Sequence, residues 1–275
     1  MNSPIIQLYP QPVRERHLKG TYLAHNVRRF ASGNQAFVYT NFITSLDGRI
    51  AVHNETTQEM QIPELIANDR DWWLFQELAS QADIIISSGR YLKDWAQGNA
   101  QEILQVDDPQ FAELRNWRCS NGLSPQADIA IISSSLNFPI PDILTACGRK
   151  VVVFTTADPK PERVKAIEKK DIQVIVAGNR KSVNGATVVN KLTELGYRTI
   201  FSSAGPKVLH LLLTSHVLDR LYITHTSRIL GGNPYTSIVE GERLNPAVDF
   251  NLTSIYLDPS GTDGLSQLFI TYDQP

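Results

Sequence analysis

The sequence has 275 residues, of which 42% are hydrophobic and 20% are charged, and its formal net charge at pH 7 is −2. This composition is typical of a globular chain with one large domain, and it provides no basic field that would favour nucleic acid. Two cysteines are too few for a disulfide framework or a cysteine-based zinc site, so we expect a reduced, cytoplasmic protein. No signal peptide is predicted, and because no apolar run approaches the ~20 residues that span a bilayer, no membrane segment is expected.

Residues 1–35 are rich in Pro, Arg and Gly, and we predict that they form an N-terminal extension ahead of one domain over residues 36–275. Within this domain, strand signals alternate with helix signals. The predicted strands are short apolar runs, several of them typical of strands covered on both faces, and they lie in 36–42, 82–88, 127–134, 149–156, 172–178, 198–206 and 217–230. The predicted helices lie in 63–81, 161–170, 184–197 and a segment that begins at Pro206.

Two C-terminal segments, 249–261 and 265–274, alternate apolar and polar residues, which indicates an antiparallel pair at an exposed sheet edge. Residues 95–126 are irregular, and a long excursion of this kind is often functional or flexible. Strand–helix–strand repetition implies right-handed crossovers, so the predicted fold class is α/β, with a mainly parallel twisted sheet flanked by helices and antiparallel C-terminal strands. Ligands of such sheets bind beyond the carboxyl ends of the strands, and this is where we expect a site.

Small and hydroxyl-bearing residues cluster at these strand ends. The segment Ser203–Pro206 stands directly before a predicted helix, an arrangement that presents backbone N–H groups to an anion. Small residues also allow a helix and a strand to pack closely, and the segment alone leaves both interpretations open. Thr155 and Thr156 could bond a ribose or a phosphate through their hydroxyls, although as an isolated pair they are typical of an ordinary strand end.

Asp47 and Gly48 follow the first predicted strand of the domain and, taken alone, are typical of a tight turn. The polar residues Asn41, Thr44 and Ser45 just before them are consistent instead with the wall of a site. The six histidines show no paired-ligand spacing, so no metal site is predicted. The sequence contains no Gly-x-Ser-x-Gly elbow, P-loop or G-x-G-x-x-G pattern, which argues against a serine hydrolase and the common nucleotide fingerprints.

Three segments resemble, in order, the reductase domain of riboflavin biosynthesis, the RibD C-terminal domain family of pyrimidine reductases related to dihydrofolate reductase. They are NFITSLDGRIA (41–51), ADIIISSGRYLKD (82–94) and FSSAGPKVLHLLLTSHVLDRLYITHTSRILGG (201–232). The resemblance implies a dihydrofolate reductase-like fold and NADPH-dependent reduction of a ribosylamino-pyrimidine phosphate, with hydride transfer from nicotinamide C4 to ribose C1′. It also implies a homodimer.

The same resemblance implies roles for individual residues. The dinucleotide phosphates are expected at two segments, namely Ser88, Gly89 and Arg90, and Ser203, Ala204, Gly205 and Pro206. The adenosine ribose and its 2′-phosphate are expected near Thr155 and Thr156. The pocket between nicotinamide and pyrimidine is expected to be lined by Asn41, Thr44, Ser45 and Asp47, of which Asp47 is the predicted catalytic residue, and Glu240 is expected on the substrate side.

The chain also departs from the family pattern. The family reads Gly-x-Gly-Thr where this chain has the segment 87–91, and Glu-Gly-Gly-Pro where it has Ser203–Pro206. The missing Glu removes a polar group on the substrate side, and Ala204 adds a methyl where backbone is expected to approach phosphate. Two alternatives therefore stay open: a nucleotide-binding relative with lost or altered activity, and a reductase of another heterocycle outside riboflavin synthesis.

Overall fold

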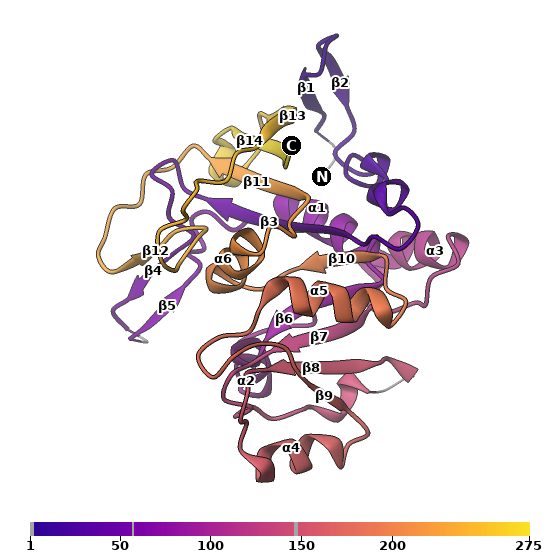
Figure 1. The fold of residues 1–275 in the computed structure, drawn as a ribbon. Coiled ribbons are helices and arrows are strands. Elements are labelled where there is room, and N and C mark those ends of the chain that lie inside the picture. Colours follow the sequence, from indigo (N-terminus) through magenta and orange to yellow (C-terminus); the bar gives the residue numbers. More distant parts are fainter. Residues whose placement is uncertain (1–2, 57, 146–147) are drawn as a thin grey trace.

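The computed structural model describes residues 3–56, 58–145 and 148–275, and the described chain is organised around one large sheet (Figure 1). The strands of this sheet run in the order β2-β1-β13-β14-β11-β3-β10-β6-β7-β8-β9. Their bounds are β1 (Ile5–Tyr9), β2 (Arg14–Arg16), β3 (Phe37–Thr44), β6 (Ile84–Ser88), β7 (Asp128–Ile132), β8 (Val151–Thr155), β9 (Gln173–Val176), β10 (Thr199–Ser202), β11 (Arg220–Thr226), β13 (Asn251–Asp258) and β14 (Gln267–Asp273).

Neighbouring strands are parallel from β11 through β9, and antiparallel from β11 outward through β14, β13, β1 and β2. The predicted fold class, an α/β fold with a mainly parallel sheet and antiparallel C-terminal strands, is therefore confirmed. The C-terminal pair β13 and β14 is not outermost, because β1 pairs with β13 and β2 with β1. The alternation of polar and apolar residues in β13 arises because one face of the strand is more exposed than the other. It does not indicate that the strand lies at the edge of the sheet.

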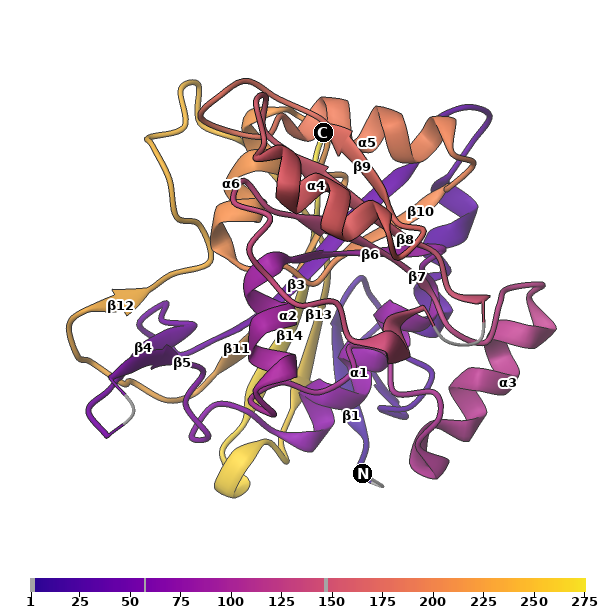
Figure 2. The same cartoon turned by 90° about the horizontal axis from the view of Figure 1, so that it is seen from below.

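Helices cover both faces of the parallel part of the sheet. They are α1 (Asp69–Ser80), α2 (Gly89–Ala96), α3 (Ala112–Ser120), α4 (Pro161–Glu168), α5 (Gly185–Glu194) and α6 (Pro206–Thr214). In Figure 2, α5 and α6 lie on one side of the sheet and α1 and α3 on the other. Successive residues of β6 alternate between the two apolar clusters, with Ile84 and Ile86 in the α5–α6 cluster and Ile85 in the α1 cluster. Burial on both faces explains the uninterrupted isoleucine run of this strand.

The N-terminal residues, expected as an extension, are joined to the main sheet in their described part. Besides forming β1 and β2, the segment contributes four side chains to the larger apolar cluster, namely Ile5, Leu18, Tyr22 and Val27. The buried carboxylate of Glu77 in α1 accepts backbone N–H groups from Gly20, Tyr22 and Leu23, and also the indole N–H of Trp73. These contacts attach the turn over residues 20–23 directly to α1.

A second, small sheet lies beside the strand ends. It has the order β12-β4-β5, with β4 (Ala51–Asn54), β5 (Glu59–Gln61) and β12 (Tyr235–Thr236). Figure 1 shows it projecting from the side of the main sheet on which β3 ends. Among the described residues, no helix has both the length and the apolar character needed to cross a membrane.

Candidate active site

A cleft of about 650 Å³ opens beside the carboxyl-terminal half of β3 and the turn after β10. Its walls come from five parts of the chain: β3, the segment between β3 and α1, the first turns of α1, the excursion after α2, and the β10–α6 turn. The lining residues are Asn41, Phe42, Ile43, Ile50, Ile62, Ala67, Asn68, Asp69, Asp71, Trp72, Phe75, Gln101, Gln105, Asp108, Gln110, Ser203, Ala204 and Gly205. The cleft thus lies where ligands of parallel α/β sheets bind.

The cleft brings together four of the predicted site residues, Asn41, Ser203, Ala204 and Gly205. A Cβ built on Gly205 meets no heavy atom within 4 Å, so this turn leaves open space beside the start of α6. Ala204 is only 6% exposed and packs in the apolar cluster of α5 and α6. Its methyl group therefore has a packing role, which agrees with the packing interpretation that the sequence left open for this segment.

Asp47, the predicted catalytic residue, is not among the residues that line this cleft. Its carboxylate accepts the hydroxyl of Ser45 at 2.5 Å and the backbone N–H groups of Leu230 and Gly231 at 3.2 and 2.9 Å, and it pairs with Arg49 at 2.5 Å. The hydrogen bond from Ser45, followed by that from Gly231, holds the pKa of Asp47 well below its usual range. The group is ionised at neutral pH and joins the 45–49 turn to the 228–232 loop.

Three further predicted substrate residues lie outside the cleft lining. Thr44 donates its hydroxyl to the carbonyl of Ser45 at 2.7 Å, and the Ser45 hydroxyl oxygen accepts the N–H of Arg49 at 3.0 Å. Both hydroxyls therefore have partners within the turn. Glu240 is exposed and pairs with Lys207 at 3.1 Å near the start of α6.

The residues predicted for the cofactor lie at the carboxyl ends of three parallel strands, β10, β6 and β8. Ser88 is the N-cap of α2 and accepts the N–H of Tyr91 at 3.4 Å, while Arg90 is exposed. Gly89 cannot take a side chain without displacement, since a Cβ there lies 2.7 Å from Phe138 Cδ1. Because β6 and β10 are neighbours, α2 and α6 begin at adjacent strand ends, so that their positive ends lie at the same edge of the sheet.

Thr155 and Thr156 end β8 two strands away from β6. Both are buried, and Thr155 Oγ1 has no hydrogen-bond partner within the described residues. A buried hydroxyl without a partner is uncommon in proteins, which makes this atom a candidate for a ligand contact.

Asp71 is the main feature of the cleft that the sequence analysis did not predict. The residue is 9% exposed, and Thr224 in β11 donates its hydroxyl to Oδ1 at 2.5 Å. Burial raises the pKa of Asp71 to about 6, against the lowering effect of the Thr224 hydrogen bond. A sequence signal did exist, since Asp71, Leu74 and Leu78 share one helical face, and a carboxylate among buried leucines is a candidate functional group.

One wall of the cleft is aromatic. Trp72 and Phe75 in α1 stack with their ring centroids 4.8 Å apart and their planes at 10°. The indole N–H of Trp72 donates to Gln105 Oε1 at 3.2 Å, and the N–H of Gln105 donates to Gln76 Oε1 at 2.8 Å. These bonds hold part of the 95–126 excursion against α1, so that its glutamines reach the cleft.

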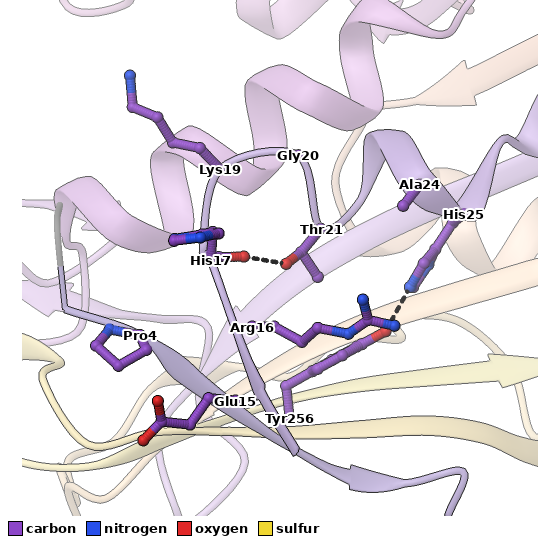
Figure 3. A pocket seen from close by; sticks show the side chains of 10 residues that line it. All are labelled: Pro4, Glu15, Arg16, His17, Lys19, Gly20, Thr21, Ala24, His25 and Tyr256. Atoms are coloured by element: carbon purple, nitrogen blue, oxygen red, sulfur yellow. Dashed lines mark hydrogen bonds between the residues drawn. The ribbon is translucent and has the colours of Figure 1, made fainter. Parts of the chain in front are cut away.

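A separate hollow of about 480 Å³ lies where the N-terminal segment meets β13 (Figure 3). None of the predicted site residues lines it. Its inner wall includes His25, which contacts the hydroxyl of Tyr256 through Nε2 at 2.9 Å and that of Tyr222 through Nδ1 at 3.2 Å. Burial, together with the charge of Arg220, lowers the pKa of His25 to about 3, so its ring is neutral.

The chain is thus an α/β protein with a cleft at the carboxyl ends of its parallel strands, the place where ligands of such sheets bind. Residues 36–262 match the family model described as the RibD C-terminal domain, and the chain belongs to this family. A curated relative from Methanothermobacter thermautotrophicus, named 2,5-diamino-6-ribosylamino-4(3H)-pyrimidinone 5′-phosphate reductase, is 22% identical over 78% of this chain and 88% of its own.

Solved structures agree on the fold. A pyrimidine reductase-like protein from Corynebacterium diphtheriae superposes with a TM-score of 0.65 at 18% identity, covering 90% of this chain and 98% of its own. The riboflavin biosynthesis reductase of Saccharomyces cerevisiae superposes with a TM-score of 0.57 at 15% identity, covering 93% and 99%. The predicted resemblance is thereby confirmed at the level of family and fold. Within the described residues, no group of three or more His, Cys, Asp or Glu side chains is arranged to hold a metal ion.

Proposed function

We propose that this protein is an NADPH-dependent reductase of a ribosylamino-pyrimidine or of a closely related amino-heterocycle. The family and the reductase names of the relatives support the reaction class. The observation that carries the proposal is the position of the cleft, which lies against the β10–α6 turn at the strand ends where two helices begin. A cofactor held at those helix starts lies next to a substrate in the cleft.

The strand ends fit a dinucleotide in three respects. The starts of α2 and α6 lie on neighbouring strands and favour anionic groups, so Ser88, Gly89 and the 203–206 turn are the proposed phosphate contacts. Gly205 leaves open space beside the helix. Thr155 offers a buried hydroxyl without a partner in the described chain, which suits the adenosine ribose region.

In the proposed reaction, NADPH held at the 203–206 turn would supply a hydride from nicotinamide C4 to ribose C1′ of the open-chain imine. Water would supply the proton taken up by the imine nitrogen, so that the C=N bond would become a single bond. The residues of this chain position the substrate and exclude water. Trp72 and Phe75 offer a flat surface for a heterocycle, and Asn41 and Asp71 offer polar contacts from facing elements. We assign Asp47 a positioning role, because its carboxylate is already occupied by four donors.

The test begins with separate fluorescence titrations of NADPH and NADH, followed by NADPH oxidation in the presence of 2,5-diamino-6-ribosylamino-4(3H)-pyrimidinone and its 5′-phosphate. The Methanothermobacter relative serves as the active control. We expect NADPH to bind more tightly than NADH and to be oxidised with at least one of the two compounds. Failure to bind either dinucleotide would refute the cofactor assignment.

The second candidate function is a nucleotide-binding protein without reductase activity. It is favoured by the substitution in the 203–206 turn, where Ser203 stands in place of the family's Glu and Ala204 is engaged in packing. Tight NADPH binding without oxidation of either compound, alongside an active control, identifies this alternative. A homodimer and a cytoplasmic location stay predictions from the resemblance and composition.

A further inference from the structure

Outside the 203–205 turn, where the dinucleotide phosphates are proposed to bind, the charge of the cleft does not match a phosphorylated substrate. Three carboxylates line it, those of Asp69, Asp71 and Asp108, and the described lining residues include no Lys, Arg or His. A phosphate monoester carries between one and two negative charges at neutral pH. Asp69 and Asp108 are exposed, whereas Asp71 is buried. Placing a phosphate beside the carboxylate of Asp71 with no cation among the described lining residues is unfavourable, since like charges repel and a desolvated anion needs donors.

The basic side chains nearest in sequence to the lining residues are paired elsewhere. Arg49 bonds Asp47 at 2.5 Å and the carbonyl of Gly232 at 3.2 Å, and its guanidinium lies over the ring of Tyr235. Arg70 pairs with the buried carboxylate of Asp258 at 2.7 Å. The third of these cations, Lys207, pairs with Glu240 at 3.1 Å. Each of these positive charges is therefore compensated by a carboxylate that does not line the cleft.

The lining does offer acceptors for N–H groups. Asp71 is nine-tenths buried and lines the cleft, and its hydrogen bond with Thr224 uses only Oδ1. Within the described chain, Oδ2 has neither a hydrogen-bond partner nor a cation. A free carboxylate oxygen on a largely buried residue of the cleft wall is matched by the amino and ring N–H donors of an amino-heterocycle, which also stacks on the Trp72–Phe75 wall.

We propose that the cleft binds an unphosphorylated aromatic amino-heterocycle, free or as its nucleoside, with Asp71 Oδ2 accepting N–H donors of the ring. This inference rests on the proposed reductase function and narrows its substrate class. It distinguishes this chain from the curated relative, whose name specifies a 5′-phosphate. A volume of about 650 Å³ is ample for a heterocycle with a pentose.

The decisive measurement is calorimetric titration of the intact protein with 2,5-diamino-6-ribosylamino-4(3H)-pyrimidinone and, separately, with its 5′-phosphate. We expect the nucleoside to bind about tenfold or more tightly than the phosphate, corresponding to one uncompensated charge contact. Tighter binding of the phosphate overturns the proposal, as does the absence of nucleoside binding.

Two variants test the residue assignment. Asp71→Asn keeps the shape but turns a donor toward the ligand, so we expect nucleoside affinity to fall about 10- to 100-fold. Asp107→Asn is the matched control, because it removes the same charge from an exposed residue that pairs with Arg115 outside the cleft; its affinity should stay within about twofold. Equal affinities of wild type and Asp71→Asn refute the assignment.

A third variant tests the charge explanation by adding a cation to the cleft. Ile62 lines the cleft and is 60% exposed, so Ile62→Lys adds a cation with room to extend. We expect it to reduce or reverse the preference for the nucleoside over the phosphate; an unchanged preference argues against the charge explanation. The test of the substrate class can fail independently of the proposed function. Nucleoside binding without NADPH oxidation contradicts the reductase function alone. Efficient NADPH oxidation with the phosphate and not with the nucleoside contradicts this inference alone.

Discussion

Thr224 Oγ1 donates a 2.5 Å hydrogen bond to the carboxylate of Asp71, across 153 residues of sequence, at the wall of the cleft. The bond joins β11 to the first turn of α1 and lowers the pKa of a carboxyl that burial raises to about 6. It thereby keeps Asp71 largely ionised at neutral pH, although the side chain is shielded from water.

The first prediction concerns the pH profile of substrate binding and turnover. Because N–H donors require ionised Asp71, we expect kcat/KM to decline as the pH falls through about 6. Thr224→Val removes the donor that lowers this pKa, so the acid limb should move to higher pH. The control is Thr226→Val, a change on the same strand as Thr224. It removes a hydroxyl bonded to the carbonyl of Thr44 and should leave the acid limb at the same pH as in the wild type. An acid limb at the same pH in both variants contradicts the role of Thr224.

The second prediction separates positioning from proton transfer at Asp47. Asp47→Asn loses the ion pair with Arg49 and part of the acceptor capacity that holds the N–H groups of Leu230 and Gly231. We expect a lower Tm and a lower turnover, with little change in NADPH affinity and no shift in the pH profile between 5 and 8. Thermal melts, steady-state kinetics and fluorescence titration measure the three quantities. A displaced acid limb would show that Asp47 titrates during the reaction.

The third prediction concerns stability at low pH. The folded-state pKa of His25, about 3, lies below its unfolded value of roughly 6.5, so the unfolded chain binds more protons in that interval. The contribution of His25 is therefore fully present above pH 6.5 and is lost as the pH falls toward 3. His25→Phe has no titrating ring, so the stability difference between wild type and variant should shrink on acidification. Urea midpoints across this range test it, and a constant difference refutes it.

The fourth prediction concerns the attachment of the N-terminal turn. Glu77→Gln keeps one acceptor oxygen and loses two of the four N–H partners, which should cost about 2–4 kcal/mol and expose residues 17–27 to hydrogen exchange. Glu113→Gln removes a pair with Lys19 of the same segment, but both side chains are largely exposed, so at most about 0.5 kcal/mol is expected. Equal protection in the two variants would contradict the distinct role of Glu77.

Much of the fold could be predicted because its signals are local. The isoleucine run of 82–88 and the apolar run of 149–156 predicted β6 and β8, and Pro206 predicted the start of α6. The sequence also indicated that the strand ends form the site, and the turn 203–205 does line the cleft. Periodicity and end signals depend on nearby residues, so a single sequence contains them.

Tertiary structure decided the features that depend on distant partners. Nothing near β13 in the sequence indicates that β1 pairs with it, because alternation reports which face is buried and not which strand lies beside it. The environment of Asp71 also depends on a distant partner. The sequence places Asp71 in the first turn of a helix, but only the folded chain brings Thr224, 153 residues away, beside it at the wall of the cleft. By itself the sequence determined most secondary structure elements, the fold class and the edge of the sheet at which the cleft lies. Only the folded chain decided which carboxylate is buried there without a cation, because burial and charge compensation are properties of neighbours in space.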